Sequence, residues 1–159
     1  MKQRIAIPLL TLTALGLCVA MPASAQTATA TCAAATPKQI EALFDRWNAS
    51  LRTGDPDQVV ANYAADGVLL PTVSNQPRTN PAEIRDYFVK FLKSSPQGSI
   101  DSRIVKIGCN VAQDVGTYTF KFADGKKVQA RYTYVYEWQD GKWLIAHHHS
   151  SAMPEQPIR

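Results

Sequence analysis

The chain has 159 residues, of which 45% are hydrophobic, and this is enough for one globular domain with a real core. Its 17 basic and 13 acidic residues give a net charge of +4. No cluster of Lys and Arg interleaves with aromatic residues, so neither nucleic acid nor an anionic membrane is indicated as a partner.

The first 25 residues have the pattern of a secretory signal peptide. Lys2 and Arg4 precede an apolar run that is too short to span a membrane, and Ala23-Ser24-Ala25 provides small residues for cleavage. We expect a periplasmic or secreted protein that is free of the membrane once this leader is removed. Because the leader carries two basic residues and no acidic ones, the exported chain would be close to neutral.

Three cysteines bear on the compartment. Cys18 lies in the leader, where lipid attachment is an alternative, but the preceding Leu17 is bulky where a small residue is needed. Cys32 and Cys109 remain in a chain exported to an oxidising space, so we predict one disulfide between them, with two separate thiols as the alternative. Neither cysteine has a neighbouring histidine, so a catalytic thiol is not indicated.

The exported part divides into an arm, a domain and a tail. Residues 26–35 are rich in Ala and Thr and lack periodicity, so we expect a flexible arm unless Cys32 anchors it. Residues 36–155 are predicted to form a single domain, and residues 156–159 a short tail.

Capping signals predict three helices in the first half of the domain. Each signal places an N-cap residue before a proline, with Gln or Glu favouring a capping box, at Thr36-Pro37, Asp55-Pro56 and Asn80-Pro81. Trp47 lies on the apolar stripe of the first helix, as a core residue or as the roof of a pocket. The second helix is predicted to run through Tyr63, before a short strand at 68–70.

Residues 71–79 contain two prolines and form a loop long enough to act as a lid. Asn75 and Arg78 are the polar groups in this loop that we expect to reach inward; a fully solvated loop is the alternative.

From residue 100 onward the chain alternates like strands, at 100–109, 115–122, 128–138 and 143–151. Helices followed by a long antiparallel sheet predict an α+β layer architecture, in which the sheet curls over the helices and leaves a cavity. Tyr118 falls on the apolar face of its strand.

The last hairpin, residues 128–151, holds most of the candidate site. Tyr132 and Tyr134 share one face, and the turn decides which histidines join them. A two-residue turn at Asp140-Gly141 would pair Trp138 with Trp143 and place His147 and His149 beside the tyrosines. A three-residue loop with Gly141 in a bulge would instead place His148 beside Tyr132 and Ser150 beside Ala130. Because neighbouring side chains point to opposite faces, the three histidines cannot converge on one metal, and we expect neither a metal site nor a cofactor.

Several motifs run through the whole domain in a characteristic order: Trp47-Asn48, Thr53-Gly54-Asp55, Tyr63-Ala64-Ala65-Asp66-Gly67, Leu70-Pro71-Thr72-Val73-Ser74-Asn75, Asp140-Gly141-Lys142-Trp143 and His147-His148-His149-Ser150. In these motifs the chain resembles the NTF2-like superfamily and, more narrowly, bacterial relatives of the association (hub) domain of calcium/calmodulin-dependent protein kinase II. The resemblance implies a cone-shaped fold, assembly into homo-oligomers through the outer face of the sheet, and an internal pocket of small-molecule size. It does not imply calmodulin regulation, since the motifs of a kinase catalytic domain are absent from the sequence.

The hub domain has arginines in its pocket, and aligning the Asp-Gly-Lys-Trp turns places two of them over Tyr134 and Ser150. This alignment puts both residues on one face and therefore favours the three-residue turn. The expected ligand-binding residues are Trp47, Asn75, Arg78, Tyr118, Tyr132, Tyr134, His148 and Ser150. The expected oligomer interface comprises Arg131, Thr133, Val135, Trp143, Ile145, His147 and His149.

Three functions follow, and the sequence favours the first. The first is an exported homo-oligomeric module that binds a small molecule of unknown identity. The second is an isomerase, cyclase or hydratase that uses His148 as a base; steroid isomerases of the superfamily use a carboxylate near Leu70-Pro71-Thr72, where this chain has none. The third is a pure assembly scaffold, in which Trp47 and Phe88 fill the cavity.

Overall fold

The computed structural model describes residues 31–155; the predicted signal peptide, residues 26–30 of the predicted arm and the predicted tail lie outside the described residues. The helices are α1 (Pro37–Leu51), α2 (Pro56–Val60) and α3 (Pro81–Phe91), the last followed by a 3₁₀ turn, η1 (Leu92–Ser94). The strands are β1 (Tyr63–Leu70), β2 (Gln97–Ile107), β3 (Val111–Lys121), β4 (Lys127–Gln139) and β5 (Lys142–Ala152).

Capping residues set where the helices begin. At α1 the hydroxyl of Thr36 accepts a bond from the backbone N–H of Gln39, and the Gln39 side chain accepts one from the backbone N–H of Thr36. Asn80 caps α3 as predicted. The capping box predicted there is incomplete, because Glu83 accepts its bond from the backbone of Thr79 instead of Asn80.

The second helix is shorter than predicted. Asp55 caps it, but α2 ends at Val60, and Tyr63 is the first residue of β1. Strand β1 pairs in parallel with β5, so backbone bonds to a strand far along the chain replace the helical bonds that the local sequence allows.

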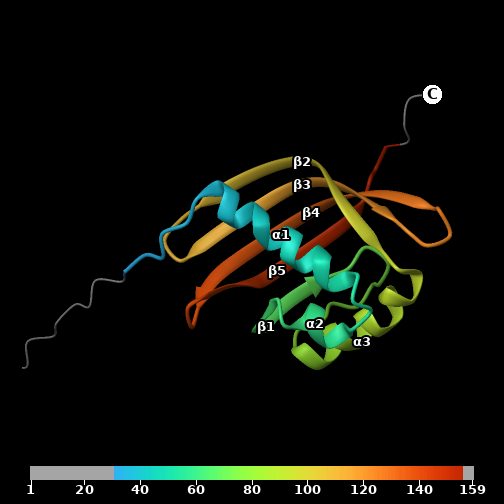
Figure 1. Cartoon of the computed structure of the whole chain (residues 1–159), viewed down its shortest axis with the longest axis horizontal. Coiled ribbons are helices and arrows are strands. Elements are labelled where there is room, and N and C mark those ends of the chain that lie inside the picture. The colour runs from blue at the N-terminus through green and yellow to red at the C-terminus, as the bar shows by residue number, and fades with distance from the viewer. Residues whose placement is uncertain (1–30, 156–159) are drawn as a thin grey trace, which may run out of the picture. The chain divides into compact units, whose positions relative to one another are not determined.

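The five strands form one sheet in the order β1-β5-β4-β3-β2, antiparallel except for the β1–β5 pair. Helix α1 crosses one face of this curved sheet, while α2 and α3 lie at its β1 end (Figure 1). We call the helix-covered side the inner face and the other side the outer face. The α+β architecture is confirmed, with a parallel edge strand added.

Aromatic residues from both layers form the core between α1, α3 and the inner face. Trp47 is buried and contacts Phe88 of α3 and Tyr134 of β4, with ring centroids 6.2 and 5.7 Å apart. Burying a side chain of this kind stabilises the fold by about 1.5–3 kcal/mol. The aromatic face predicted from the alternation of β3 and β4 is therefore the face that the helices cover.

The β4–β5 hairpin has a two-residue turn. Asp140 and Gly141 both have positive φ angles, 49° and 79°, as a type I′ turn requires, and Trp138 pairs with Trp143. The three-residue turn that the alignment favoured is wrong.

A bulge in β5 then changes the register. Tyr136 pairs with Ile145, but its neighbour Val135 pairs with His147, so Ala146 is the extra residue. One extra residue sends every later side chain of β5 to the face opposite the one that the turn alone would give.

Beyond the bulge, His148 pairs with Tyr134 and Ser150 pairs with Tyr132. Both His148 and Ser150 therefore lie on the inner face, as expected. Each pairs with a residue of β4 that is two positions after the one predicted.

Trp143 and Ile145 precede the bulge and also point inward. They are 8% and 1% exposed and belong to the core, so their assignment to an oligomer interface is wrong. The alternation places the other residues of the predicted interface on the outer face: Arg131, Thr133, Val135, His147 and His149. Their contact with a second subunit stays a prediction.

Candidate functional site

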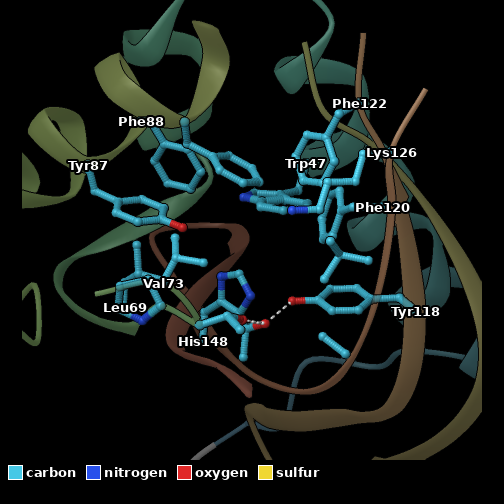
Figure 2. Close-up of a pocket in the computed structure, with 16 residues that line it drawn as sticks. Trp47, Leu69, Val73, Tyr87, Phe88, Tyr118, Phe120, Phe122, Lys126 and His148 are labelled. Atoms are coloured by element: carbon cyan, nitrogen blue, oxygen red, sulfur yellow. Dashed lines mark hydrogen bonds between the residues drawn. The ribbon is translucent and has the colours of Figure 1, made fainter. Parts of the chain in front are cut away.

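A cavity of about 170 Å³ lies between α1, α3, the loop after β1 and the inner face of the sheet. Figure 2 shows the aromatic rings that surround this cavity. His148 lies on one side of the cavity, and Phe122 and Lys126 lie together, away from His148. Most of the lining is apolar, and it contains no carboxylate among the residues that the structure describes. The lining residues are Trp47, Leu69, Pro71, Thr72, Val73, Tyr87, Phe88, Phe91, Tyr118, Phe120, Phe122, Lys126, Val128, Ala130, His148 and Ser150.

Three hydroxyl groups meet on one side of the cavity, and we call Thr72, Tyr118 and Ser150 the hydroxyl cluster. The Tyr118 hydroxyl donates to Ser150 Oγ at 2.5 Å, and the hydroxyls of Ser150 and Thr72 are bonded to each other. Tyr118 comes from β3, Ser150 from β5 and Thr72 from the loop after β1. The cluster therefore joins that loop to the sheet.

His148 stands beside the hydroxyl cluster, two residues before Ser150 on the same face of β5. Its Nδ1 lies 2.9 Å from the hydroxyl oxygen of Tyr63. The imidazole stacks on Tyr134, with ring centroids 4.2 Å apart, and forms a T-shaped pair with Trp47, with centroids 5.3 Å apart. Its Nε2 is buried and has no hydrogen-bond partner within residues 31–155.

The groups around this part of the cavity are uncharged at neutral pH. Burial, followed by the effects of His147 and His149, lowers the pKa of His148 to about 3. Burial raises the pKa of Tyr118 and holds that of Tyr63 well above its ordinary value. The imidazole is therefore neutral and the phenols stay protonated, which suits the site to hydrogen bonding more than to ion pairing.

Four of the predicted ligand-binding residues line the cavity: Trp47, Tyr118, His148 and Ser150. Tyr134 lies on the inner face but packs against the His148 ring instead of lining the cavity. Tyr132 bonds to a buried carboxylate. Tyr134 therefore supports a lining residue, and the Tyr132 ring packs against another one, Tyr118, with ring centroids 5.0 Å apart.

The lid residues Asn75 and Arg78 are not among the lining residues. Asn75 is exposed, and Arg78 donates to Ser74 Oγ at 3.3 Å and lines a separate groove with Lys90 and Tyr87. The loop does reach inward, but through Thr72. Backbone bonds between Leu69 and Arg78 close the loop at its base, which leaves its early residues to face the cavity.

Sequence reasoning missed Thr72, Tyr87 and Lys126 as lining residues. Tyr87 lies on the aromatic stripe of α3, and burial raises its pKa to about 12, partly offset by Arg78. Lys126 is in the turn between β3 and β4. Neither Thr72 nor Lys126 carries a periodic signal, because each lies in a loop whose path only the folded chain defines.

A buried carboxylate on the inner face was also missed. Asp114 is fully buried on β3, accepts from the Tyr132 hydroxyl at 2.9 Å and from Arg103 Nε at 3.1 Å, and forms an ion pair with Arg103. Burial raises the pKa of Asp114, while Tyr132 and Arg103 oppose this. Asp114 is four residues before Tyr118, so alternation along one strand places both side chains on the same face. The strand was predicted to start at residue 115, so Asp114 was not included. Asp114 is not among the residues that line the cavity.

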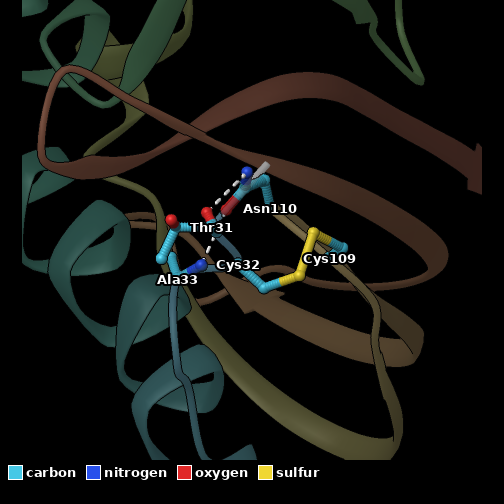
Figure 3. Close-up of a disulfide and its surroundings, with 5 residues drawn as sticks. All are labelled: Thr31, Cys32, Ala33, Cys109 and Asn110. Atoms are coloured by element: carbon cyan, nitrogen blue, oxygen red, sulfur yellow. Dashed lines mark hydrogen bonds between the residues drawn. A yellow bond between two sulfur atoms is a disulfide. The ribbon is translucent and has the colours of Figure 1, made fainter. Parts of the chain in front are cut away.

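Cys32 and Cys109 form a disulfide, as predicted (Figure 3). Cys109 lies in the turn after β2, and the next residue, Asn110, accepts a bond from the backbone N–H of Ala33 at 2.7 Å. Residues 31–35 of the arm are therefore anchored beside the β2–β3 turn. Disulfides are typical of proteins in oxidising compartments. None of the described helices is long and apolar enough to cross a membrane. No group of three or more potential metal ligands occurs among the described residues.

Residues 36–154 match the family model described as calcium/calmodulin dependent protein kinase II association domain. A solved structure from Xanthomonas campestris, described as such an association domain, is 50% identical to this chain with a TM-score of 0.72, covering 82% of this chain and 100% of that one.

More distant structures share the fold alone. An NTF2-like protein from Pseudomonas putida is 19% identical, with a TM-score of 0.66 over 76% of this chain and 88% of that one. A protein from Streptomyces avermitilis described as a dehydratase of the NTF2-like family is 13% identical, with a TM-score of 0.66 over 74% and 96% of the two chains.

Proposed function

Since the chain belongs to the calcium/calmodulin-dependent protein kinase II association domain family, we propose that it is an exported, self-associating domain that binds a small, largely apolar molecule. The observation that carries the binding function is the cavity itself, which has aromatic walls and a few convergent polar groups. A domain built only for assembly would gain stability by filling this space.

Self-association is proposed through the outer face. The name of the family supports it, because an association domain is an assembly module. The half-buried residues Thr133, Val135 and His147 support it as well, because they form a patch of mixed polarity on adjacent strands. Export is supported by the pattern of the first 25 residues and by the disulfide.

Binding is favoured over catalysis by the chemistry of His148. A general base works best when its pKa is near the working pH, and a histidine with a pKa of about 3 is a weak base at pH 7. The lining also offers no carboxylate among the described residues. The enzyme remains the second candidate because His148 Nε2 is unpartnered beside the cavity.

Native mass spectrometry of the protein purified from its own cells tests this proposal. We expect oligomers that carry a small additional mass, and we expect that mass to disappear on mild denaturation. The variant Ala130→Leu, which adds volume to the lining, should lose the additional mass, whereas Ser151→Ala on the outer face should retain it. Bare oligomers would contradict the binding function, and monomers would contradict self-association.

A further inference from the structure

The hydroxyl cluster has a definite hydrogen-bonding capacity. Thr72, Tyr118 and Ser150 together hold three O–H hydrogens, and two of these are used in the bonds that join the three groups. One hydrogen is left over whichever of Thr72 and Ser150 donates to the other. Oxygen lone pairs are left over as well, so the cluster can both donate to and accept from one further hydroxyl group.

The cluster has no charged group beside it. His148 is neutral, and Tyr118 stays protonated because burial raises its pKa. Lys126 is the one cationic side chain that lines the described cavity, and it lies with Phe122, away from His148 (Figure 2). A carboxylate placed at the hydroxyl cluster would therefore be buried without a cation, which costs several kcal/mol.

The rest of the cavity fits one six-membered ring. An apolar protein cavity of about 150 Å³ holds a benzene molecule, and this cavity measures about 170 Å³. The edge-to-face pairs that Phe120 forms with Trp47 and Tyr118 show that the walls present aromatic faces and edges.

We propose, on the premise that the cavity binds a ligand, that it selects an uncharged, hydroxylated single-ring molecule of the phenol class, whose hydroxyl group joins the hydroxyl cluster. The selectivity comes from two opposite penalties. A ring without an oxygen leaves the spare hydrogen of the cluster unpaired, and a ring with a carboxylate buries an uncompensated charge.

The test uses phenol, toluene and benzoate as probes of similar size at pH 7. Binding to the disulfide-intact protein is followed by NMR of the methyl groups of Leu69 and Val128, which line the cavity, with Ile104 on the exposed edge strand as the methyl that should not respond. We expect phenol to bind more tightly than toluene, and at least about tenfold more tightly than benzoate.

A variant with an apolar cluster, Thr72→Val/Tyr118→Phe/Ser150→Ala, removes all three hydroxyls together and so leaves none of them unpaired. In this variant we expect toluene to bind more tightly than phenol, while Ser151→Ala should keep the order of the wild type. The wild-type measurements stand by themselves if the triple variant does not fold.

Tighter binding of toluene or benzoate than of phenol by the wild type would overturn the assignment to phenols and leave the binding function intact. If the triple variant kept the wild-type ratio of affinities for phenol and toluene, the assignment to phenols would also be overturned. If none of the three probes shifts the lining methyls at millimolar concentration, the proposed binding function fails together with the inference.

Discussion

The Nδ1 atom of His148 lies 2.9 Å from the hydroxyl oxygen of Tyr63, across the junction between β5 and β1. Both side chains are buried, so this bond ties the parallel edge strand to the sheet in the interior of the protein. It also explains how a histidine can be buried without a carboxylate partner, since a neutral imidazole needs only neutral hydrogen-bonding groups.

The first prediction concerns pH. Because the pKa of His148 is about 3 in the folded chain and about 6.5 in an unfolded one, the unfolded chain binds a proton between these values that the folded chain does not. The stabilisation is complete above pH 6.5 and is lost as the pH falls toward 3. We expect the free energy of unfolding to fall by about 2 kcal/mol between pH 7 and pH 5 from this group alone.

Urea unfolding at several pH values measures this effect. The His148→Gln variant should lack this part of the pH dependence, while His147→Gln should retain it. A His148→Gln variant with the full pH dependence of the wild type would contradict the assignment.

The second prediction tests the register that the Asp140-Gly141 turn sets in β5 before the bulge at Ala146. Ile145 is 1% exposed on the inner face, so Ile145→Ala should cost about 2–5 kcal/mol of unfolding free energy. Its neighbour Leu144 points outward and is half-buried, so Leu144→Ala should cost about 1 kcal/mol or less. Chemical denaturation compares the two variants, and equal losses would mean that the inner face is assigned wrongly.

The third prediction concerns the Arg103–Asp114 pair. Arg103→Met leaves the fully buried carboxylate of Asp114 without its cation, and we expect a loss of about 3–5 kcal/mol. Adding Asp114→Asn should recover most of this loss, which a double-mutant cycle measures. The exposed pair of Arg85 and Asp57 is the matched comparison, since Arg85→Met removes a solvent-screened contact and should cost far less than Arg103→Met. Simple additivity of the Arg103 and Asp114 substitutions would refute the coupling.

The fourth prediction concerns the disulfide. Cys32 and Cys109 are separated by 77 positions in the sequence, so their bond restricts a long loop in the unfolded chain. The variant Cys32→Ser/Cys109→Ser should lose about 4 kcal/mol of unfolding free energy, and reduction of the wild type should produce the same loss. If the oxidised wild type and the variant unfold at the same denaturant concentration, the bond does not stabilise the fold.

The fifth prediction concerns self-association. Val135→Glu introduces a charge at the centre of the proposed outer-face contact, so we expect the oligomer to dissociate in light scattering at micromolar concentration. Val73→Glu makes the same change on the exposed loop and should leave the oligomer unchanged. An intact oligomer in the Val135→Glu variant would place the contact elsewhere.

Several parts of the site could be predicted from the sequence because their causes are local. Thr36, Asp55 and Asn80 cap the helices through bonds to residues a few positions away, so the signal lies within one turn of the chain. The alternation of Tyr132 and Tyr134 likewise follows from the pleat of a single strand. The inner face of β4 was therefore visible in the sequence.

The alternation of β5 alone could not show which face it presents. The hub alignment placed His148 and Ser150 inward correctly, but through a turn that the structure does not have. The Asp140-Gly141 turn fixes the register for only the first residues, and the bulge at Ala146 then reverses the alternation. Next to the bulge, β1 lies close against β5, because a Cβ atom on Gly67 would lie 2.9 Å from the carbonyl oxygen of Ile145. A pattern of period two shows which side chains share a face within an unbroken strand, but it does not mark where a bulge adds a residue.

The sequence by itself determined where the helices begin and the aromatic inner face of β4, since these depend on residue type and short spacing. It also indicated the disulfide and the family resemblance, through the number of cysteines and the order of the motifs. Only the tertiary structure decided that Trp143 and Ile145 belong to the core and that Thr72 completes the hydroxyl cluster with Ser150. The physical reason is that a cavity is formed by loops and strands from distant parts of the chain, whose mutual positions depend on packing and backbone pairing over long separations.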